Sequence, residues 1–419
     1  MNSTAWSDLY RNFAGQLPAY ARNARITLCG LASCIDAYLR LHENEGLFNA
    51  QSGTRQAQLA NELLNRVENG IGGELHLDWK EGGKWIEENL RITNWGIGGT
   101  GAQAAQALAT LGAPALMSLE DRCAEVLDIL HPGIEVATAS GIVPCVAVAK
   151  NKRSRPAHYI FEYTSGKQIA GINPGRSSRT IVRFADDSLD SDPDFVRESI
   201  NKAGSAGAGI LCGFNEVAND ELEMALDQAS NLAGRWLTNG LGTIHLELGG
   251  YTHSNTQELV LERLCGTFTS LGMSLSELDG LLKSPGDPIK RSIQLAERWS
   301  LHRVCVHADS WAIAVTRGDP EQEFNALLCG NLLASSRAEA GRIVFPKRPP
   351  DHAVYEDRFP QRYRRLGKFH GLYSTAPYLK CPTATIGLGD TFLAGTLLVL
   401  GQTPGGASAA HQSTHHLCN

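Results

Sequence analysis

The feature that most constrains the fold is a strand–loop–helix rhythm that runs through the C-terminal half of the chain. Short apolar runs at 209–212, 243–248 and 303–307 are followed by segments of helical periodicity, expected as helices at 219–233, 254–264 and 321–340. A helix over 1–24 and a buried strand over 25–31 precede them. Alternation of this kind predicts a doubly wound, mostly parallel sheet with helices on both faces.

A second, β-rich part interrupts this rhythm. Alternating runs at 142–149, 158–163 and 180–184 are separated by basic or Gly/Pro turns, which predicts a small antiparallel sheet. A chain of 419 residues is also too long for one compact core. We therefore expect two parts. The large α/β domain is predicted at 1–34, 43–71, 97–139 and 185–419, the discontinuous β-rich lid at 35–42, 72–96 and 140–184, and a flexible tail at 411–419.

Charge and composition argue against several classes of protein. The formal net charge of −6 argues against a nucleic-acid partner, which usually needs a basic surface. The first 25 residues lack the apolar core of a signal peptide, and no stretch has the 18 apolar residues that predict a membrane span. Ten cysteines without a CxxC pair are typical of reduced thiols in a cytoplasmic protein. The sequence leaves the oligomeric state open.

The sharpest motif is Gly387-Leu388-Gly389-Asp390, which follows a β-branched run and precedes an apolar helix. Glycines let the backbone approach a ligand, and the free N–H groups of a helix start can hold a phosphate. An aspartate at that position could take a proton from an attacking hydroxyl. The same four residues also fit an ordinary strand–helix turn in which Asp390 is the N-cap.

Three further patterns could contribute to a site, and each has a structural alternative. Gly98-Gly99-Thr100 opens an alanine-rich helix, and no clear strand precedes it; it suits either sugar binding or close helix packing. His245 and Glu247 share one side of a predicted strand near its carboxyl end, where they could hold the waters of Mg²⁺ or form a buried pair.

The third pattern is a basic cluster in the predicted lid, which fits either phosphate contacts or a solvated turn. Its members are Lys150, Lys152, Arg153, Arg155, Arg176 and Arg179. The sequence contains no P-loop motif and no GxSxG, so any phosphoryl transfer must use a different phosphate cradle.

Taken in order from about 26 to 400, these segments resemble the ADP-dependent sugar kinases, the glucokinase/phosphofructokinase group of the ribokinase-like superfamily. The resemblance implies a ribokinase-like fold, ADP as phosphoryl donor and Mg²⁺ as cofactor. It assigns Asp390 as catalytic base, with Arg179 touching the transferred phosphate and Gly387, Leu388 and Gly389 forming the anion hole. It implies sugar contacts for Asp36, Glu74, Gly98, Gly99 and Thr100, metal contacts for Glu247 and Glu277, and a nucleotide-side role for His307 and Thr383.

One segment departs from the family pattern. The family has Gly-x-Asn-Glu-x-Glu-Leu in a turn near the metal, whereas this chain has Ser274 and Leu275 at the Asn and Glu positions and keeps Glu277. Loss of an amide and a carboxylate would weaken Mg²⁺ placement or alter nucleotide handling.

The expected reaction is transfer of a phosphoryl group from ADP to a hydroxyl of a sugar or sugar phosphate, with release of AMP. Two alternatives stay open on the sequence. One is an ATP-dependent ribokinase-type sugar or nucleoside kinase, which shares the base and the anion hole. The other is a non-catalytic sugar or nucleotide sensor, which the altered turn at Ser274 would suit.

Overall fold

The computed structural model describes residues 3–152, 155–185, 188–215, 217–251, 254–283, 285–359 and 361–402. The predicted tail at 411–419 and Arg153 lie outside the described residues. Twelve α-helices are assigned within these ranges. They are α1 Ser3–Asn23, α2 Arg55–Asn69, α3 Gly82–Asn89, α4 Thr100–Thr110, α5 Ala124–Ile129, α6 Pro193–Lys202, α7 Leu222–Thr238, α8 Ser254–Leu264, α9 Leu275–Leu281, α10 Pro288–Arg298, α11 Pro320–Ala340 and α12 Leu388–Leu400.

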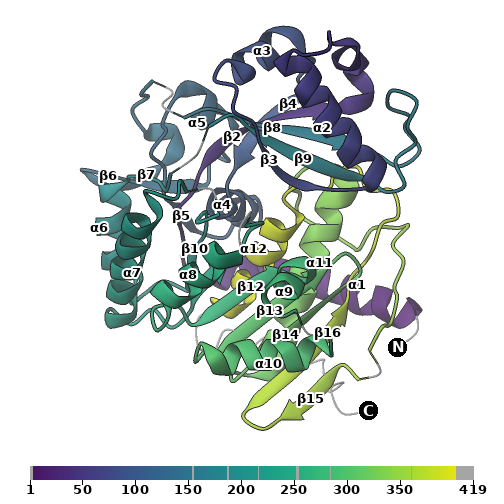
Figure 1. Ribbon diagram of the computed structural model, residues 1–419. Helices are drawn as coiled ribbons and strands as arrows, with labels where there is room; N and C mark the ends of the chain where they lie inside the picture. The colour runs from purple at the N-terminus through teal and green to yellow at the C-terminus, as the bar shows by residue number, and fades with distance from the viewer. Residues whose placement is uncertain are drawn as a thin grey trace.

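A large sheet forms the lower part of the molecule in Figure 1 and has helices on both faces. Its strands, in spatial order, are β15 Tyr363–Leu366, β16 Phe369–Thr375, β14 Trp311–Thr316, β13 Arg303–Ala308, β12 Ser270–Ser274, β11 Ile244–Glu247, β10 Ala208–Leu211, β1 Thr27–Cys29, β5 Ala115–Met117, β6 Ile134–Thr138 and β7 Gly141–Pro144. The strands from β6 to β13 are parallel, and β7, β14 and β15 pair antiparallel with their neighbours.

The strand order reverses beside β1, because the chain first adds β5 and β6 on one side and later β10 on the other. Ligands of doubly wound proteins bind at such a switch point, outside the carboxyl ends of the strands. The central strands β1 and β10 are buried along their whole length, as expected for strands covered on both faces. A ligand-binding site is therefore expected outside the carboxyl ends of β1 and β10, on the side where the second sheet lies (Figure 1).

The small sheet contains five strands in the order β3 Gly73–His76, β9 Ser178–Arg183, β8 His158–Tyr163, β2 Cys34–Arg40 and β4 Asn94–Gly98. The prediction of a purely antiparallel sheet was wrong, because β2 pairs parallel with β8 and β3 pairs parallel with β9. Long connections through the large domain separate β2 from β8, and such connections allow parallel pairing. A strand that the sequence pattern did not indicate, β4, leads directly into the glycines before α4.

Two segments lie in a different part from the one expected. The run that begins at 142 was placed in the lid, but β7 pairs with β6 at the edge of the large sheet. The stretch 43–71 was placed in the large domain, but α2 packs on the small sheet: Tyr163 of β8 donates to the carbonyl oxygen of Arg66 at 3.4 Å, and Arg66 donates to that of Glu74 at 2.7 Å. Figure 1 shows α2 and α3 above the small sheet.

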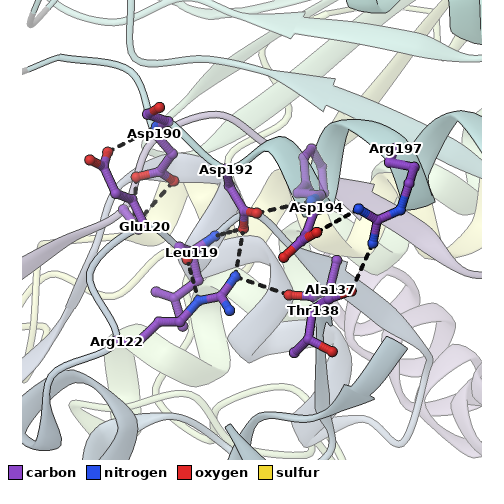
Figure 2. A network of polar contacts seen from close by, with 12 residues as sticks. Leu119, Glu120, Arg122, Ala137, Thr138, Asp190, Asp192, Asp194 and Arg197 are labelled. Carbon is purple, nitrogen blue, oxygen red and sulfur yellow. Dashed lines mark hydrogen bonds and ion pairs between the residues drawn. The ribbon is translucent and has the colours of Figure 1, made fainter. Parts of the chain in front are cut away.

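Several chain crossings between the two sheets converge on the side chain of Arg155. Its guanidinium donates to the carbonyl oxygens of Ser188 and Leu189 and forms an ion pair with Glu120 at 2.7 Å. Glu120 also accepts a hydrogen bond from the amide of Ser191, and Ser33 donates to Asp190 at 3.0 Å. Figure 2 shows Glu120 and Asp190 beside each other in this network. The connection from β1 to β2 is thus bound to the connection from β9 to α6.

Asp192 anchors the start of α6 in the same region (Figure 2). One carboxylate oxygen accepts the amide of Phe195 at 2.9 Å as the helix N-cap, and the other accepts the amide of Leu119 at 3.1 Å and pairs with Arg122 at 3.2 Å. The Asp192 side chain is only 2% exposed, so its charge depends on these partners.

We predict that Asp192→Ala lowers the free energy of unfolding by about 3 kcal/mol, because it removes an N-cap and leaves the Arg122 guanidinium without its buried partner. Asp194→Ala is the matched control: its pair with Arg197 is partly exposed, and such pairs contribute about 0.5 kcal/mol. Urea unfolding of both variants measures the difference. Equal effects of the two substitutions would contradict this account of the network.

Candidate active site

Two helices begin side by side at the centre of the molecule. Helix α4 starts after Gly99 and α12 starts after Gly387; both glycines have positive φ values, 84° and 65°, and neither cap has a side-chain hydrogen bond. The first N–H groups of both helices therefore have no capping side chain and are available to bind an anionic group. The N-cap of α12 is Gly387, so the alternative in which Asp390 is the N-cap was wrong.

Arg337 of α11 joins these two helices. Its buried guanidinium donates through Nη1 to Oε1 of Gln103 at 2.7 Å, to the carbonyl oxygen of Gly387 at 3.0 Å and to the hydroxyl of Thr391 at 2.9 Å. A Cβ on Gly387 would lie 2.3 Å from Arg337 Nη2. The glycine is thus required both by its backbone conformation and by the close approach of the arginine. Sequence reasoning missed Arg337.

Asp390 lies in the first turn of α12, half-buried between cations. Burial raises the pKa of its carboxyl group, while a hydrogen bond from the Thr100 side chain and the charges of Arg337 and Arg179 oppose that shift. The carboxylate is therefore a stronger proton acceptor than a solvated aspartate and is still held by partners from α4, α11 and β9.

Asp36 of β2 lies in the small sheet and interacts electrostatically with Asp390 and Arg337. Burial raises the pKa of the Asp36 carboxyl group to about 6. Its oxygens accept a weak hydrogen bond from the Tyr38 hydroxyl at 3.4 Å and one from the Cys34 thiol at 3.6 Å. A Cβ on Gly98 of β4 would lie 2.3 Å from Asp36 Oδ1, so only glycine fits against this carboxylate.

Arg179 of β9 is a further charged group near Asp390. Burial lowers the pKa of its guanidinium group, and the carboxylates of Asp390, Glu162 and Glu74 oppose that shift. Glu162 faces Arg179 across the β8–β9 pair and interacts with Arg337; sequence reasoning missed it, although its place in the alternating run 158–163 was visible. Glu74 lies 2.9 Å from the guanidinium of Arg183, so its charge is partly neutralised within the small sheet.

The other basic residues of the predicted cluster do not gather at this site. Lys150 is 56% exposed and pairs with Asp128, and Lys152 is exposed. Arg155 is bound in the network of chain crossings described above. Arg176 lies close enough to Arg179 to lower the pKa of that guanidinium group. Of the described members, Arg176 and Arg179 alone remain as cations for an anionic ligand here.

A row of polar side chains runs along β11, β12 and β13, from Ser270 at the start of β12 to His307 near the end of β13. Nδ1 of His245 lies 2.8 Å from the Ser270 hydroxyl, its Nε2 lies 2.7 Å from Glu247, and the other Glu247 oxygen lies 3.6 Å from His307. Although burial opposes it, hydrogen bonds with the two histidines lower the pKa of Glu247 to about 2. Glu247 therefore keeps its negative charge. The His307 ring that it contacts lies close to Gly389, where an added Cβ would be 3.2 Å from the ring.

The altered turn forms a helix cap. Ser274 accepts the amide of Glu277 at 3.3 Å, and Glu277 Oε2 accepts the amide of Ser274 at 2.6 Å, which together make a capping box for α9. Burial raises the pKa of the Glu277 carboxyl group, and Glu277 interacts with Glu247 and His307. These two oxygen-donor carboxylates fit Mg²⁺ held largely through its waters, because Mg²⁺ usually binds one or two carboxylates and keeps several waters.

Thr383, expected on the nucleotide side, is exposed. Its amide donates to the carbonyl oxygen of Ala338 at 2.7 Å and fixes the segment before α12 to the end of α11. His307 lies farther inside, against the ring of Phe392, with the ring centroids 5.4 Å apart.

Residues 27–350 match a family model described as the ADP-specific phosphofructokinase/glucokinase conserved region. The chain belongs to this family of ADP-dependent sugar kinases. No curated protein matches the sequence at a significant level.

Solved structures confirm the ribokinase-like fold of this family member. An ADP-dependent kinase in complex with fructose-6-phosphate and ADPβS is 17% identical, with a TM-score of 0.77 over 96% of this chain and 99% of the other. A reconstructed last common ancestor of the ADP-dependent phosphofructokinases from Methanosarcinales is 16% identical, with a TM-score of 0.72 over 96% and 99%. A phosphofructokinase from Pyrococcus horikoshii with AMP is 17% identical, with a TM-score of 0.69 over 90% and 97%. Among the described residues, no helix is long and apolar enough to cross a membrane.

We predict that Gly387→Ala lowers the free energy of unfolding by at least about 2 kcal/mol and also lowers kcat, because alanine disfavours the left-handed conformation and its Cβ would displace Arg337. Gly234→Ala in α7 is the matched control: nothing lies within 4 Å of its added Cβ, so a gain of roughly 0.5–1 kcal/mol is expected. Thermal unfolding and steady-state kinetics test both. A Gly387→Ala protein as stable and active as wild type would contradict the packing described here.

Proposed function

We propose that this chain transfers the terminal phosphoryl group of ADP to a hydroxyl of a sugar phosphate and releases AMP, with Asp390 as the catalytic base. The placement of Asp390 carries the proposal. Its carboxylate lies in the first turn of α12, hydrogen-bonded to Thr100 of α4, with Arg179 and Arg337 close by and Asp36 facing it from the small sheet.

In the proposed reaction, Asp390 takes the hydroxyl proton while the hydroxyl oxygen attacks the phosphorus and AMP leaves. The N–H groups of Gly387, Leu388 and Gly389 hold the transferring phosphoryl group, and Arg179 neutralises its charge. The free N–H groups of the α12 start support this role, because no side chain caps them. Mg²⁺, held through Glu247 and Glu277, would neutralise charge on the nucleotide phosphates.

Asp36 and Glu74 are proposed to bind sugar hydroxyls, because both carboxylates belong to the small sheet. Gly98, Gly99 and Thr100 are proposed to let the sugar approach the backbone. The lack of side-chain atoms at Gly98 supports this, since any Cβ there would meet Asp36. Movement of the small sheet toward the large one would exclude water from the transferring group.

A phosphorylated acceptor is favoured over a neutral sugar by two neighbouring arginines, Arg179 on β9 and Arg176 in the segment just before this strand. Arg176 and Arg179 repel each other, and an anionic group between them would relieve that repulsion. The structural neighbour with fructose-6-phosphate bound provides a suitable first substrate for assays. Glucose and ribose, with and without a phosphate, complete the panel.

We predict that Asp390→Asn lowers kcat by roughly 10²–10⁴-fold, because the amide cannot accept the hydroxyl proton, while the affinity for the sugar changes little. Asp351→Asn is the matched control, since Asp351 is exposed and pairs with Arg348 at the surface. AMP release measures kcat, and calorimetry measures sugar binding. An Asp390→Asn enzyme with wild-type kcat would overturn the assignment of the base.

A further inference from the structure

Three side chains of the small sheet, those of Cys34, Asp36 and His158, converge because of the register of its strands. Cys34 and Asp36 are two residues apart on β2 and therefore point to the same face. His158 on β8 is the direct partner of Asp36 in the parallel pair, and Gly98 on β4 is the direct partner of Cys34 in the antiparallel pair. A thiol, a carboxylate and an imidazole thus meet on one face, next to a position without a side chain.

The distances within this group are those of metal ligands. The Cys34 sulfur lies 3.4 Å from Nδ1 of His158 and 3.6 Å from Oδ1 of Asp36. In a tetrahedral zinc site, Zn–S bonds of about 2.3 Å and Zn–N or Zn–O bonds of about 2.0–2.2 Å place two ligand atoms roughly 3.5–3.6 Å apart. The three donor atoms lie within 4.8 Å of one another, and all three residues are buried.

Gly98 packs directly against two of these donors. An added Cβ there would be 2.3 Å from the Asp36 oxygen and 2.5 Å from the Cys34 sulfur, so no residue with a side chain fits beside both donors. Tyr38 donates to the second Asp36 oxygen, an arrangement that orients a ligating carboxylate. A set of one thiolate, one imidazole and one carboxylate favours Zn²⁺ over Mg²⁺, which prefers oxygen ligands alone.

We propose that Cys34, Asp36 and His158 form a zinc-binding site, and that zinc bound there inhibits the enzyme by competing with the sugar for Asp36. On binding, the Cys34 thiol loses its proton to solvent, and bonds form from sulfur, imidazole nitrogen and carboxylate oxygen to the metal. A water completes the tetrahedral coordination of the metal. The inhibitory part rests on the proposed sugar-binding role of Asp36, whereas the metal site itself does not.

The metal site is tested without any activity assay. The full chain, free of metal, is titrated with Zn²⁺ by calorimetry and with Co²⁺ by absorption spectroscopy, in which a thiolate ligand gives a sulfur-to-cobalt charge-transfer band. We expect a band in wild type and in Cys265→Ala, whose substituted thiol is exposed and outside the group, but no band in Cys34→Ala. We also expect Cys34→Ala to lose at least about 100-fold in affinity for Zn²⁺, because a direct ligand is removed.

Absence of the charge-transfer band in wild type, or equal Zn²⁺ affinity of wild type and Cys34→Ala, would overturn the site. The wild-type spectrum keeps this test valid even where the variant folds poorly. For the inhibitory part, sugar binding is measured by calorimetry with and without Zn²⁺. We expect Zn²⁺ to lower the apparent sugar affinity of wild type, and unchanged sugar affinity would overturn the competition. A chain that bound Zn²⁺ but had no kinase activity would refute the proposed function and leave the metal site intact.

Discussion

The buried guanidinium of Arg337 is the interaction on which the site depends. It fixes Gln103 of α4, Gly387 and Thr391 relative to one another, and so holds two helix N-termini side by side. Burying an arginine is costly unless its hydrogen bonds are made, and here they are made to the segments that carry the proposed base and anion hole. The same guanidinium interacts electrostatically with Asp36 and Glu162 of the small sheet, so its positive charge affects carboxylates on both sides of the site.

The two sheets divide the proposed work. The large sheet supplies a rigid phosphate side, where Glu247 is held by His245 and His307 and keeps its charge. The small sheet supplies the groups proposed to bind the sugar. The network around Arg155 and Asp190 links the chain segments that connect the two sheets. A displacement of the small sheet relative to the large sheet must therefore break or strain these buried ionic contacts.

Local patterns in the sequence predicted the parallel sheet and the helices α1, α4, α7, α8, α11 and α12, and the helix predicted at 254–264 has the observed bounds. The helices α3, α5, α6, α9 and α10 were not predicted. The placement of 142–149 and of α2 could not be predicted, because their partners depend on packing between distant segments. Arg337 and Glu162 were missed because neither belongs to a short sequence motif, and their places in the site also depend on packing between distant segments. The capping box at Ser274 was readable as a Ser-x-x-Glu pattern, and it explains the departure from the family turn as a local helix cap. The roles of the site residues stay predictions.

The most direct test of the account is the identity of the nucleotide product. The chain is incubated with Mg²⁺ and fructose-6-phosphate, with either ADP or ATP as donor, and nucleotides and sugar phosphates are quantified together. The account predicts that AMP forms from ADP in equal amount to a newly phosphorylated sugar, and that ATP is a poor donor. Faster phosphorylation from ATP than from ADP, or binding of both ligands with no phosphorylated product from any sugar of the panel, would contradict it.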